Sequence, residues 1–179
     1  EIVMNQKWAQ KLVVGTMHRL YPGSDFKIHK LDASVALYTY CGYRNIKRDA
    51  FDHTPLLFIS GSKDDMTPAK YCERLVPWIN ARGGNASIVV IPNAWHSLDA
   101  HYPMNFHRTV HTDAACDLMT NENGTTTDLL TGHITPANEE LNMAFRNCST
   151  TVGFHDGNLG GDSWKAGVDN WLPFIEANM

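Results

Sequence analysis

Short continuous hydrophobic runs in this chain are interspersed with segments whose hydrophobic residues recur at helical spacing. The clearest run covers Leu56 to Ser60, is opened by Pro55 and is closed by Gly61. A short run of large apolar side chains between such residues is typical of a strand buried on both faces. Strand-forming residues also gather at 31–40 and 87–91, so these two segments are predicted strands as well.

Helical spacing of the apolar residues predicts helices at 2–20, 69–82 and 164–178. The middle helix lies between two predicted strands and is ended by Gly83-Gly84. This strand–helix–strand order is typical of a parallel sheet. Pro173 lies inside the last predicted helix and should bend it or mark a break, because proline removes a helical hydrogen bond.

The stretch between Asp99 and Gly161 is richer in Asn, Thr, His and Gly than the rest of the chain. Only residues 138–146 have a helical pattern there, with Asn138 as a candidate cap. Long loops in compact domains are usually functional or covalently tied down. We therefore expect an α/β fold with three parallel strands flanked by helices. It should form one domain over 1–179, with an insertion at about 99–161; residues 42–53 are a further predicted loop.

Composition and charge exclude several classes of protein. With 179 residues, 43% of them hydrophobic and 19% charged, the chain is typical of one globular domain. The net charge of −4 and the lack of long charge runs argue against nucleic acid as a partner. No apolar stretch approaches the roughly 20 residues that span a bilayer, so no membrane partner is expected. The opening residues, EIVMNQKW, lack the basic start and apolar middle of a secretory signal.

The four cysteines are Cys41, Cys72, Cys116 and Cys148, and none belongs to a Cys-x-x-Cys pair. The spacing of a zinc knuckle is therefore absent, and three disulfide pairings are open. A disulfide between Cys116 and Cys148 is attractive because these residues bracket most of the insertion. Free buried thiols in a cytosolic protein fit the cysteine count equally well.

Candidate chemistry follows two of the predicted strands. Asp64 and Asp65 come after the strand at 55–60, and His96 comes after the strand at 87–91. The carboxyl ends of parallel strands meet at one edge of a sheet, where ligands and reacting groups gather. There a carboxylate can orient an imidazole and leave its second nitrogen free as a base. Taken singly, the acidic residues would also suit a turn or helix cap, and His96 a surface loop. The paired placement favours catalysis.

These residues belong to a longer resemblance. The segments PLLFISGSKDDMTPAKYC and AWHSLD resemble the C-terminal half of the dienelactone hydrolase family of α/β hydrolases. The resemblance extends back through LDASVALYTYC and forward through CSTTVGFHDGNLGGDSWKAGVDNWLPFI. It implies a partial α/β-hydrolase fold that contains the late strands of the sheet, with Asp64 as the triad acid and His96 as the general base. Asp65 is then a neighbour of the acid, although the tandem leaves a swap open.

The resemblance also implies how the cysteines pair. Some secreted-looking members of the family join a cysteine after the first of these strands to one in the next helix, which matches Cys41 and Cys72. They also carry a cysteine-bracketed insertion before the last helix, which matches Cys116 and Cys148.

The chain departs from this family at the nucleophile. These hydrolases place a serine in a Gly-x-Ser-x-Gly elbow between a strand and a helix, ahead of the acid and the base. The chain contains no such pattern: Ser163 follows Gly161 but has Lys165 where glycine is needed, and Ser24 lies in a turn after a helix. The first predicted helix resembles the one that follows such an elbow. We therefore expect the chain to start just downstream of its nucleophile and to be inactive alone.

The sequence contains three weaker candidates. Cys41 precedes Asp64 and His96 in the order that a nucleophile requires, but no helix or glycine pattern follows it, so a disulfide or buried thiol is favoured. His107 and His111 could share a helical face as metal ligands. No His-Glu-x-x-His pattern accompanies them, so a solvated loop is favoured and neither a metal nor a cofactor is expected. The glycines of FHDGNLGGDSW suit a turn better than a phosphate loop.

The predicted function is therefore serine-type hydrolysis of a small ester or lactone, with this chain supplying the acid and the base. The alternative is a non-catalytic binding domain on a hydrolase scaffold, for which the missing nucleophile is the main argument. A half sheet exposes an edge, so we expect a missing N-terminal half or another chain to cover it. The cysteines favour a periplasmic or secreted protein, with a cytoplasmic one as the alternative.

Overall fold

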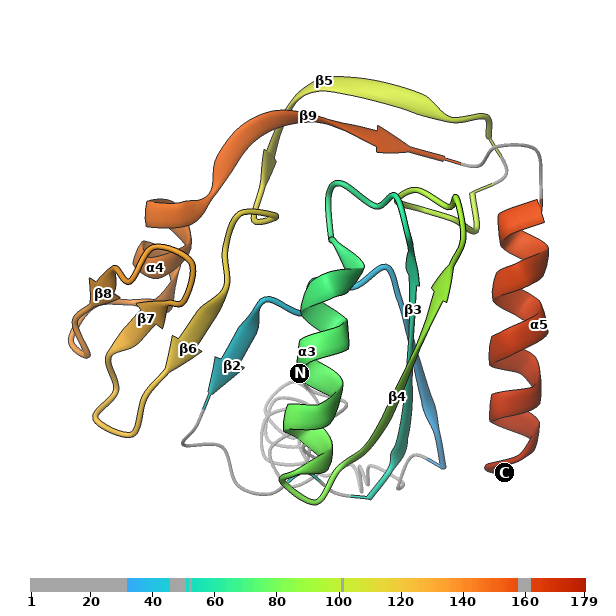
Figure 1. Ribbon diagram of the computed structural model, residues 1–179, viewed down its shortest axis with the longest axis horizontal. Helices are drawn as coiled ribbons and strands as arrows, with labels where there is room; N and C mark the ends of the chain where they lie inside the picture. Colours follow the sequence, from blue (N-terminus) through green and yellow to red (C-terminus); the bar gives the residue numbers. More distant parts are fainter. Residues whose placement is uncertain (1–31, 46–50, 52, 101, 158–161) are drawn as a thin grey trace, which may run out of the picture.

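The computed structural model describes residues 32–45, 51, 53–100, 102–157 and 162–179 (Figure 1). The helix predicted at 2–20 lies outside the described residues. The described strands are β1 (Ser34–Leu37), β2 (Tyr43–Asn45), β3 (Pro55–Gly61), β4 (Asn85–Ile91), β5 (Asn105–Thr112), β6 (Leu118–Thr120), β7 (Thr126–Asp128), β8 (Ile134–Thr135) and β9 (Thr150–Asp156). The described helices are α3 (Ala69–Asn80), α4 (Leu141–Cys148) and α5 (Asp162–Glu176).

A three-stranded parallel sheet of order β1-β3-β4 forms the centre of the described fold. It confirms the three predicted strands, their parallel arrangement and the general α/β class. β1 is shorter than the predicted strand at 31–40. It ends at Leu37 because Tyr38 has a φ of 36°, a backbone conformation that an extended strand does not accommodate.

Alternate side chains of β3 pack against opposite layers. Leu56 and Phe58 join the apolar cluster that contains Tyr71, Leu75 and Ile79 of α3. The intervening residues of β3, Leu57 and Ile59, join a second cluster that includes Trp171 and Phe174 of α5. The two helices therefore cover the two faces of the sheet, and β3 is buried on both, as its continuous apolar run predicts.

The two helices of the core lie close to their predicted positions. α3 is followed by a turn in which Gly83 has a φ of 82°, a conformation that glycine adopts without a steric penalty. α5 runs without a break through Pro173, so a break at this residue is wrong. The proline lies close to the C-terminal end of the helix, where it removes a single hydrogen bond and few turns follow.

The insertion at about 99–161 is more ordered than the sequence predicts. β5 and β9 form an antiparallel ribbon, and β6, β7 and β8 form a second sheet. The predicted loop at 42–53 contributes β2 to that sheet, paired in parallel with β6. The helix predicted at 138–146 is α4, whose N-cap position is occupied by Glu140 rather than by Asn138. These strands escaped prediction because several of their Thr and Asp residues are buried while apolar residues such as Phe106 and Ile134 are exposed, so the hydrophobic alternation of a half-buried strand is missing.

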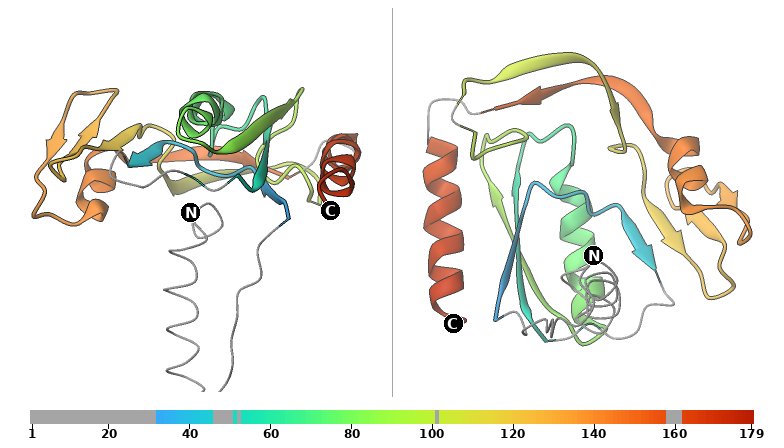
Figure 2. Two further views of the ribbon diagram at one scale, coloured as in Figure 1. Left: turned by 90° about the horizontal axis from the view of Figure 1, so that it is seen from below. Right: turned by 180° about the vertical axis from the view of Figure 1, so that it is seen from behind.

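The ribbon of β5 and β9 crosses the end of the sheet at which β3 and β4 finish (Figure 1). Figure 2 shows the same arrangement from two further sides, with the small sheet and α4 at one end of the molecule and α5 at the other. The insertion therefore lies beside the carboxyl ends of the parallel strands, where the candidate acid and base were predicted.

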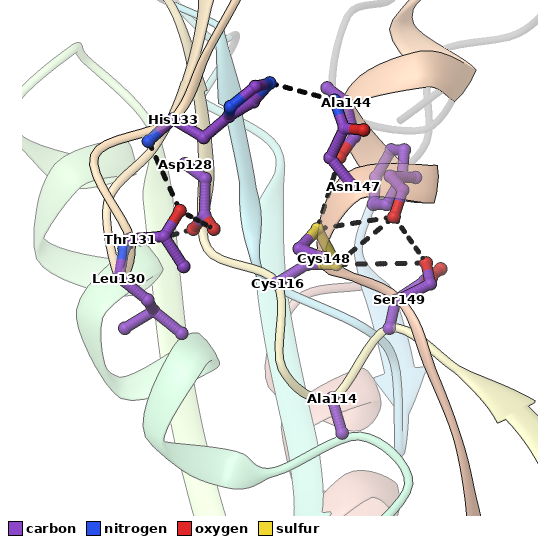
Figure 3. Close-up of a disulfide and its surroundings, with 12 residues drawn as sticks. Ala114, Cys116, Asp128, Leu130, Thr131, His133, Ala144, Asn147, Cys148 and Ser149 are labelled. Carbon is purple, nitrogen blue, oxygen red and sulfur yellow. Dashed lines mark hydrogen bonds between the residues drawn. A yellow bond between two sulfur atoms is a disulfide. The ribbon is translucent and has the colours of Figure 1, made fainter.

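One disulfide lies in the core and one lies in the insertion. Cys41, after β1, is bonded to Cys72 of α3, and Cys116, before β6, is bonded to Cys148 at the end of α4. This is the pairing that the resemblance implies. None of the four cysteines is free, which contradicts both the free-thiol alternative and the use of Cys41 as a nucleophile. Figure 3 shows the bond between Cys116 and Cys148, with Ser149 beside it.

No helix among the described residues is long and apolar enough to cross a bilayer.

Candidate active site

The side chains of Asp64 and His96 meet at the carboxyl ends of β3 and β4. Asp64 lies in the turn after β3, and His96 lies in the segment after β4. The Nδ1 atom of His96 lies 3.0 Å from Oδ2 of Asp64, a hydrogen-bond distance. The carboxylate is fully buried and the imidazole is 14% exposed. The two residues that the sequence singled out are therefore in direct contact.

Backbone amides fix the carboxylate of Asp64. Its Oδ1 accepts hydrogen bonds from the N–H groups of Met66, at 3.0 Å, and Thr67, at 2.7 Å. Oδ2 is left for the imidazole and for the Thr67 hydroxyl, at 2.8 Å. An aspartate that bonds the amides two and three residues ahead also forms the turn that starts α3. Asp64 therefore has both roles: it caps the turn, which was the alternative from the sequence, and it contacts His96.

Thr67 connects three parts of the site. Its hydroxyl lies 2.8 Å from the carbonyl oxygen of Tyr38 and 3.1 Å from Nδ1 of His96, in addition to its contact with Asp64. The ring of Tyr38 packs edge-on against the imidazole, with ring centroids 4.9 Å apart. The positive φ of Tyr38 therefore occurs beside the candidate base. Uncommon backbone conformations of this kind gather at functional sites.

The second ring nitrogen of His96 is available for chemistry. Within the part of the chain that the structure describes, every hydrogen bond of the ring falls on Nδ1. A carboxylate on Nδ1 places the proton there and leaves the lone pair of Nε2 to accept a proton from a hydroxyl group. Tyr38 and Phe154 flank the ring. The arrangement is chemically suited to general base catalysis.

The insertion holds the backbone of His96. The N–H of Gly157 donates to the carbonyl oxygen of His96 at 3.0 Å, and His96 forms a parallel bridge with Asp156. Ser97 follows with a φ of 52°. The sequence predicted no strand at 150–156 and could not show that this segment reaches the candidate base.

Asp65 binds a different histidine. Its Oδ1 accepts the backbone N–H of His155 at 2.9 Å, and its Oδ2 lies 2.8 Å from Nδ1 of the same residue. Two consecutive carboxylates thus hold two histidines, and Asp65 makes no hydrogen bond to His96. Asp64, and not Asp65, is therefore the carboxylate that contacts His96. The sequence missed His155, because it lies in a segment where no element was predicted.

Asp156 adds a second negative charge near His96. Its Oδ2 accepts the hydroxyl of Tyr102 at 2.7 Å and lies 3.5 Å from Nε2 of His107. Burial alone would raise the pKa of Asp156. Hydrogen bonds from Ser97 and Tyr102, together with the nearby imidazoles of His96 and His107, outweigh burial, so this pKa lies below its ordinary value. Asp156 is therefore a carboxylate, and not a carboxylic acid, at neutral pH.

His107 and His111 lie on β5, so the loop favoured for them is wrong, and they do not share a helical face. His107 stacks on Phe154 and His111 is exposed. Among the described residues no three His, Cys, Asp or Glu side chains are grouped as metal ligands.

An apolar cavity of about 450 Å³ lies on the side of β1 and α3. Its lining includes Val35, Phe51, Phe58, Trp78 and Phe145, but neither Asp64 nor His96.

Comparison of the chain with protein-family models, with curated proteins and with solved structures finds no match in any of the three. The fold and the site define the class only as an α/β protein with a buried aspartate–histidine pair at the carboxyl ends of a parallel sheet. A more specific assignment rests on the chemistry of that pair.

Proposed function

We propose that the protein is a serine-type hydrolase of the dienelactone hydrolase family, acting on ester or lactone bonds, in which Asp64 and His96 are the triad acid and base. The observation that carries the proposal is the 3.0 Å contact between the buried carboxylate and Nδ1 of a histidine whose Nε2 is available. The resemblance around both residues gives the proposal its substrate class.

Each residue has one task in this mechanism. His96 Nε2 takes the proton of a serine hydroxyl as the oxygen attacks the carbonyl carbon of the substrate, and then gives that proton to the departing alkoxide. Water attacks the resulting acyl-enzyme in the same way, and the acid product leaves. Asp64 keeps the imidazole in its working tautomer and stabilises the imidazolium ion that forms during both steps.

The serine and the oxyanion hole are proposed to come from a segment outside these 179 residues. Among the described residues, β1 pairs only with β3, so its other edge can accept a further strand. The apolar cavity beside β1 offers a surface for the same segment or for another chain. A strand and a Gly-x-Ser-x-Gly elbow in the coding sequence ahead of Glu1 would provide both missing parts.

The experiment uses the polypeptide that extends these residues upstream. We expect it to hydrolyse an activated ester or a small lactone and to react with a fluorophosphonate. His96→Gln should lower kcat by about 10³-fold or more, because the serine loses its base. His133→Gln is the matched control, because His133 is exposed and lies in the segment between β7 and β8, in the insertion. Equal turnover by the His96 variant and wild type would exclude the mechanism.

The 179-residue chain is the second arm of this experiment. We expect it not to hydrolyse the ester, because it carries no nucleophile elbow. Turnover that a serine inhibitor blocks in the short chain would contradict the placement of the nucleophile. An extended polypeptide that binds a small ester but neither hydrolyses it nor reacts with the fluorophosphonate would favour the non-catalytic binding domain.

The two disulfides are compatible with an extracellular location. We propose that the protein is periplasmic or secreted. Mass spectrometry of protein isolated without reductant from its natural source should show no alkylatable thiol, and four free thiols would favour the cytoplasm.

A further inference from the structure

His155 lies between the two loops that carry the candidate acid and base. Its backbone N–H and its Nδ1 both bind the carboxylate of Asp65, at 2.9 and 2.8 Å. The ring packs against the indole of Trp95, with ring centroids 4.2 Å apart. One side chain, supplied by β9, thus contacts the loop after β3 and the loop after β4.

The partners of His155 are the sequence neighbours of the two candidate catalytic residues. Asp65 directly follows Asp64, and Trp95 directly precedes His96. Asp65 and Trp95 are thus each one peptide unit from a member of the pair, so a contact that holds them together also restrains the segments that carry Asp64 and His96. The residue that follows β9 adds a further restraint next to the base, since Gly157 N–H donates to the carbonyl oxygen of His96.

The ring of His155 is itself held in place. Phe106 of β5 packs on it with ring centroids 4.8 Å apart, so the imidazole has an aromatic neighbour from each of two segments. The Asp65 and His155 side chains are 35% and 30% exposed, so their contact contributes little to global stability. Its geometry is nevertheless specific, because the carboxylate receives two hydrogen bonds from one residue.

We infer that His155 is a positioning residue: it bridges Asp65 and Trp95 and thereby holds Asp64 and His96 at hydrogen-bond distance. The inference rests on the proposed function for its catalytic consequence, whereas its structural consequence can be measured on this chain alone. It also gives the insertion a role, since β9 supplies the residue that sets the geometry of the acid and base.

Three substitutions separate the parts of this bridge. His155→Phe keeps a ring against Trp95 and removes the side-chain bond to Asp65. His155→Asn keeps a donor near the position of Nδ1 and removes the ring, and His155→Ala removes both. In all three variants two other hydrogen bonds keep the ribbon attached to the core. Thr112 Oγ1 donates to the carbonyl oxygen of Met66 at 3.1 Å, and the hydroxyl of Tyr71 donates to the carbonyl oxygen of Ala114 at 2.7 Å.

The first readout is structural and needs no substrate. We expect the Nδ1 proton of His96, observed by NMR in the 179-residue chain, to exchange with water about tenfold faster in His155→Ala than in wild type, because its bond to Asp64 opens more often. The Phe and Asn variants should lie between these two. His111→Ala is the matched control on the same ribbon, because His111 is exposed, and it should behave as wild type.

Crystal structures of wild type and the His155→Ala variant test the contact between His96 and Asp64 independently of the NMR signal. We expect the separation between His96 Nδ1 and Asp64 Oδ2 to lengthen beyond 3.5 Å or to show two rotamers in the variant. An unchanged separation together with unchanged proton exchange in all three variants would overturn the inference. If the alanine variant does not fold, the same two measurements on the Phe and Asn variants decide.

The second readout is kinetic and uses the upstream-extended polypeptide. We expect His155→Ala to lower kcat about tenfold with little change in KM, because alignment of the base matters in the transition state. Partial recovery in His155→Asn would separate positioning from a merely structural role. Failure of the proposed function is distinguishable: it would appear as full activity in His96→Gln, whereas failure of this inference would appear as an undisturbed contact between Asp64 and His96.

Discussion

The parallel core and the insertion of this protein are built in opposite ways. In the core, the apolar residues of β3 are all buried, and Ile59 has no exposed surface. In the insertion, several large apolar side chains are exposed and several polar ones are buried, beside a small apolar cluster around Leu118 and Ala144. The exposed apolar residues include Phe106, Leu129, Leu130, Ile134 and Val152. The buried polar residues are Thr112, Asp117, Thr126, Asp128 and Thr135.

The difference shows that two sets of forces maintain one fold. Burial of apolar area stabilises the core. The insertion has a smaller apolar cluster and depends in addition on a disulfide, on ion pairs and on hydrogen bonds. Asp117, for example, is buried and pairs with Arg44 and Arg74. Removing one partner of such a buried pair leaves a charge without compensation, so these polar contacts hold the insertion in one arrangement.

The largest expected difference in stability is between two truncations of a large aliphatic side chain to alanine, one in the core and one in the insertion. Ile59→Ala in β3 should lower the free energy of unfolding by about 4 kcal/mol, because it leaves a cavity in a fully buried layer. Leu130→Ala in the insertion should lower it by less than about 0.5 kcal/mol, because Leu130 is 51% exposed. Urea denaturation of both variants measures the difference. Similar losses for the two variants would contradict the contrast between the regions.

The disulfide of the insertion should have the next largest effect. Cys116→Ser with Cys148→Ser opens a covalent loop whose ends are separated by 32 residues. A loop of this length predicts a loss of about 3.7 kcal/mol. We expect the loss to be local, so that amides of β6, β7 and α4 exchange faster while those of β3 and β4 stay protected. Equal deprotection of both regions would show that the insertion does not open by itself.

Tyr40 connects the two regions and should have a smaller effect. Its hydroxyl donates to the carbonyl oxygen of Cys116 at 2.7 Å, and its ring packs near Tyr71 and Phe145. Tyr40→Phe should lower the free energy of unfolding by about 1 kcal/mol, because the carbonyl loses its partner.

The effect of Tyr40 depends on pH. Burial, with the Asp113 carboxylate nearby, holds the pKa of Tyr40 well above its ordinary value of 10.0. The unfolded chain therefore ionises first. The stabilisation from this group is complete below pH 10.0 and is lost as the pH rises above that value. Wild type should thus lose more stability than Tyr40→Phe between pH 9 and pH 11, and parallel pH profiles would contradict this assignment.

The core was predictable because its signals are local. The apolar run of β3, the helical spacing of α3 and the β-branched residues of β4 each depend on a few consecutive residues. Asp64 and His96 were predictable for a related reason, since strand direction alone brings their loops to one edge of the sheet. The cysteine pairing was not fixed by spacing and came from the resemblance.

The insertion was not predictable because its signals are not local. β9 is a strand because it pairs with β5, and nothing in its seven residues marks a buried face. His155 contacts Asp65, 90 positions earlier in the chain. Only the folded ribbon shows that contact. Likewise, the left-handed conformation of Tyr38 shortens β1 although its residues favour a strand.

Asp64→Asn and Asp65→Asn, compared in the upstream-extended polypeptide, test the central assignment most directly. The two substitutions are chemically identical and one residue apart, and kcat for an activated ester is the measurement. We predict a loss of about 10³- to 10⁴-fold for Asp64→Asn, because the imidazole takes the wrong tautomer. Asp65→Asn should cost about tenfold or less, because it only weakens the bridge to His155. A loss for Asp65→Asn that equals or exceeds that for Asp64→Asn would contradict the assignment of Asp64 as the acid.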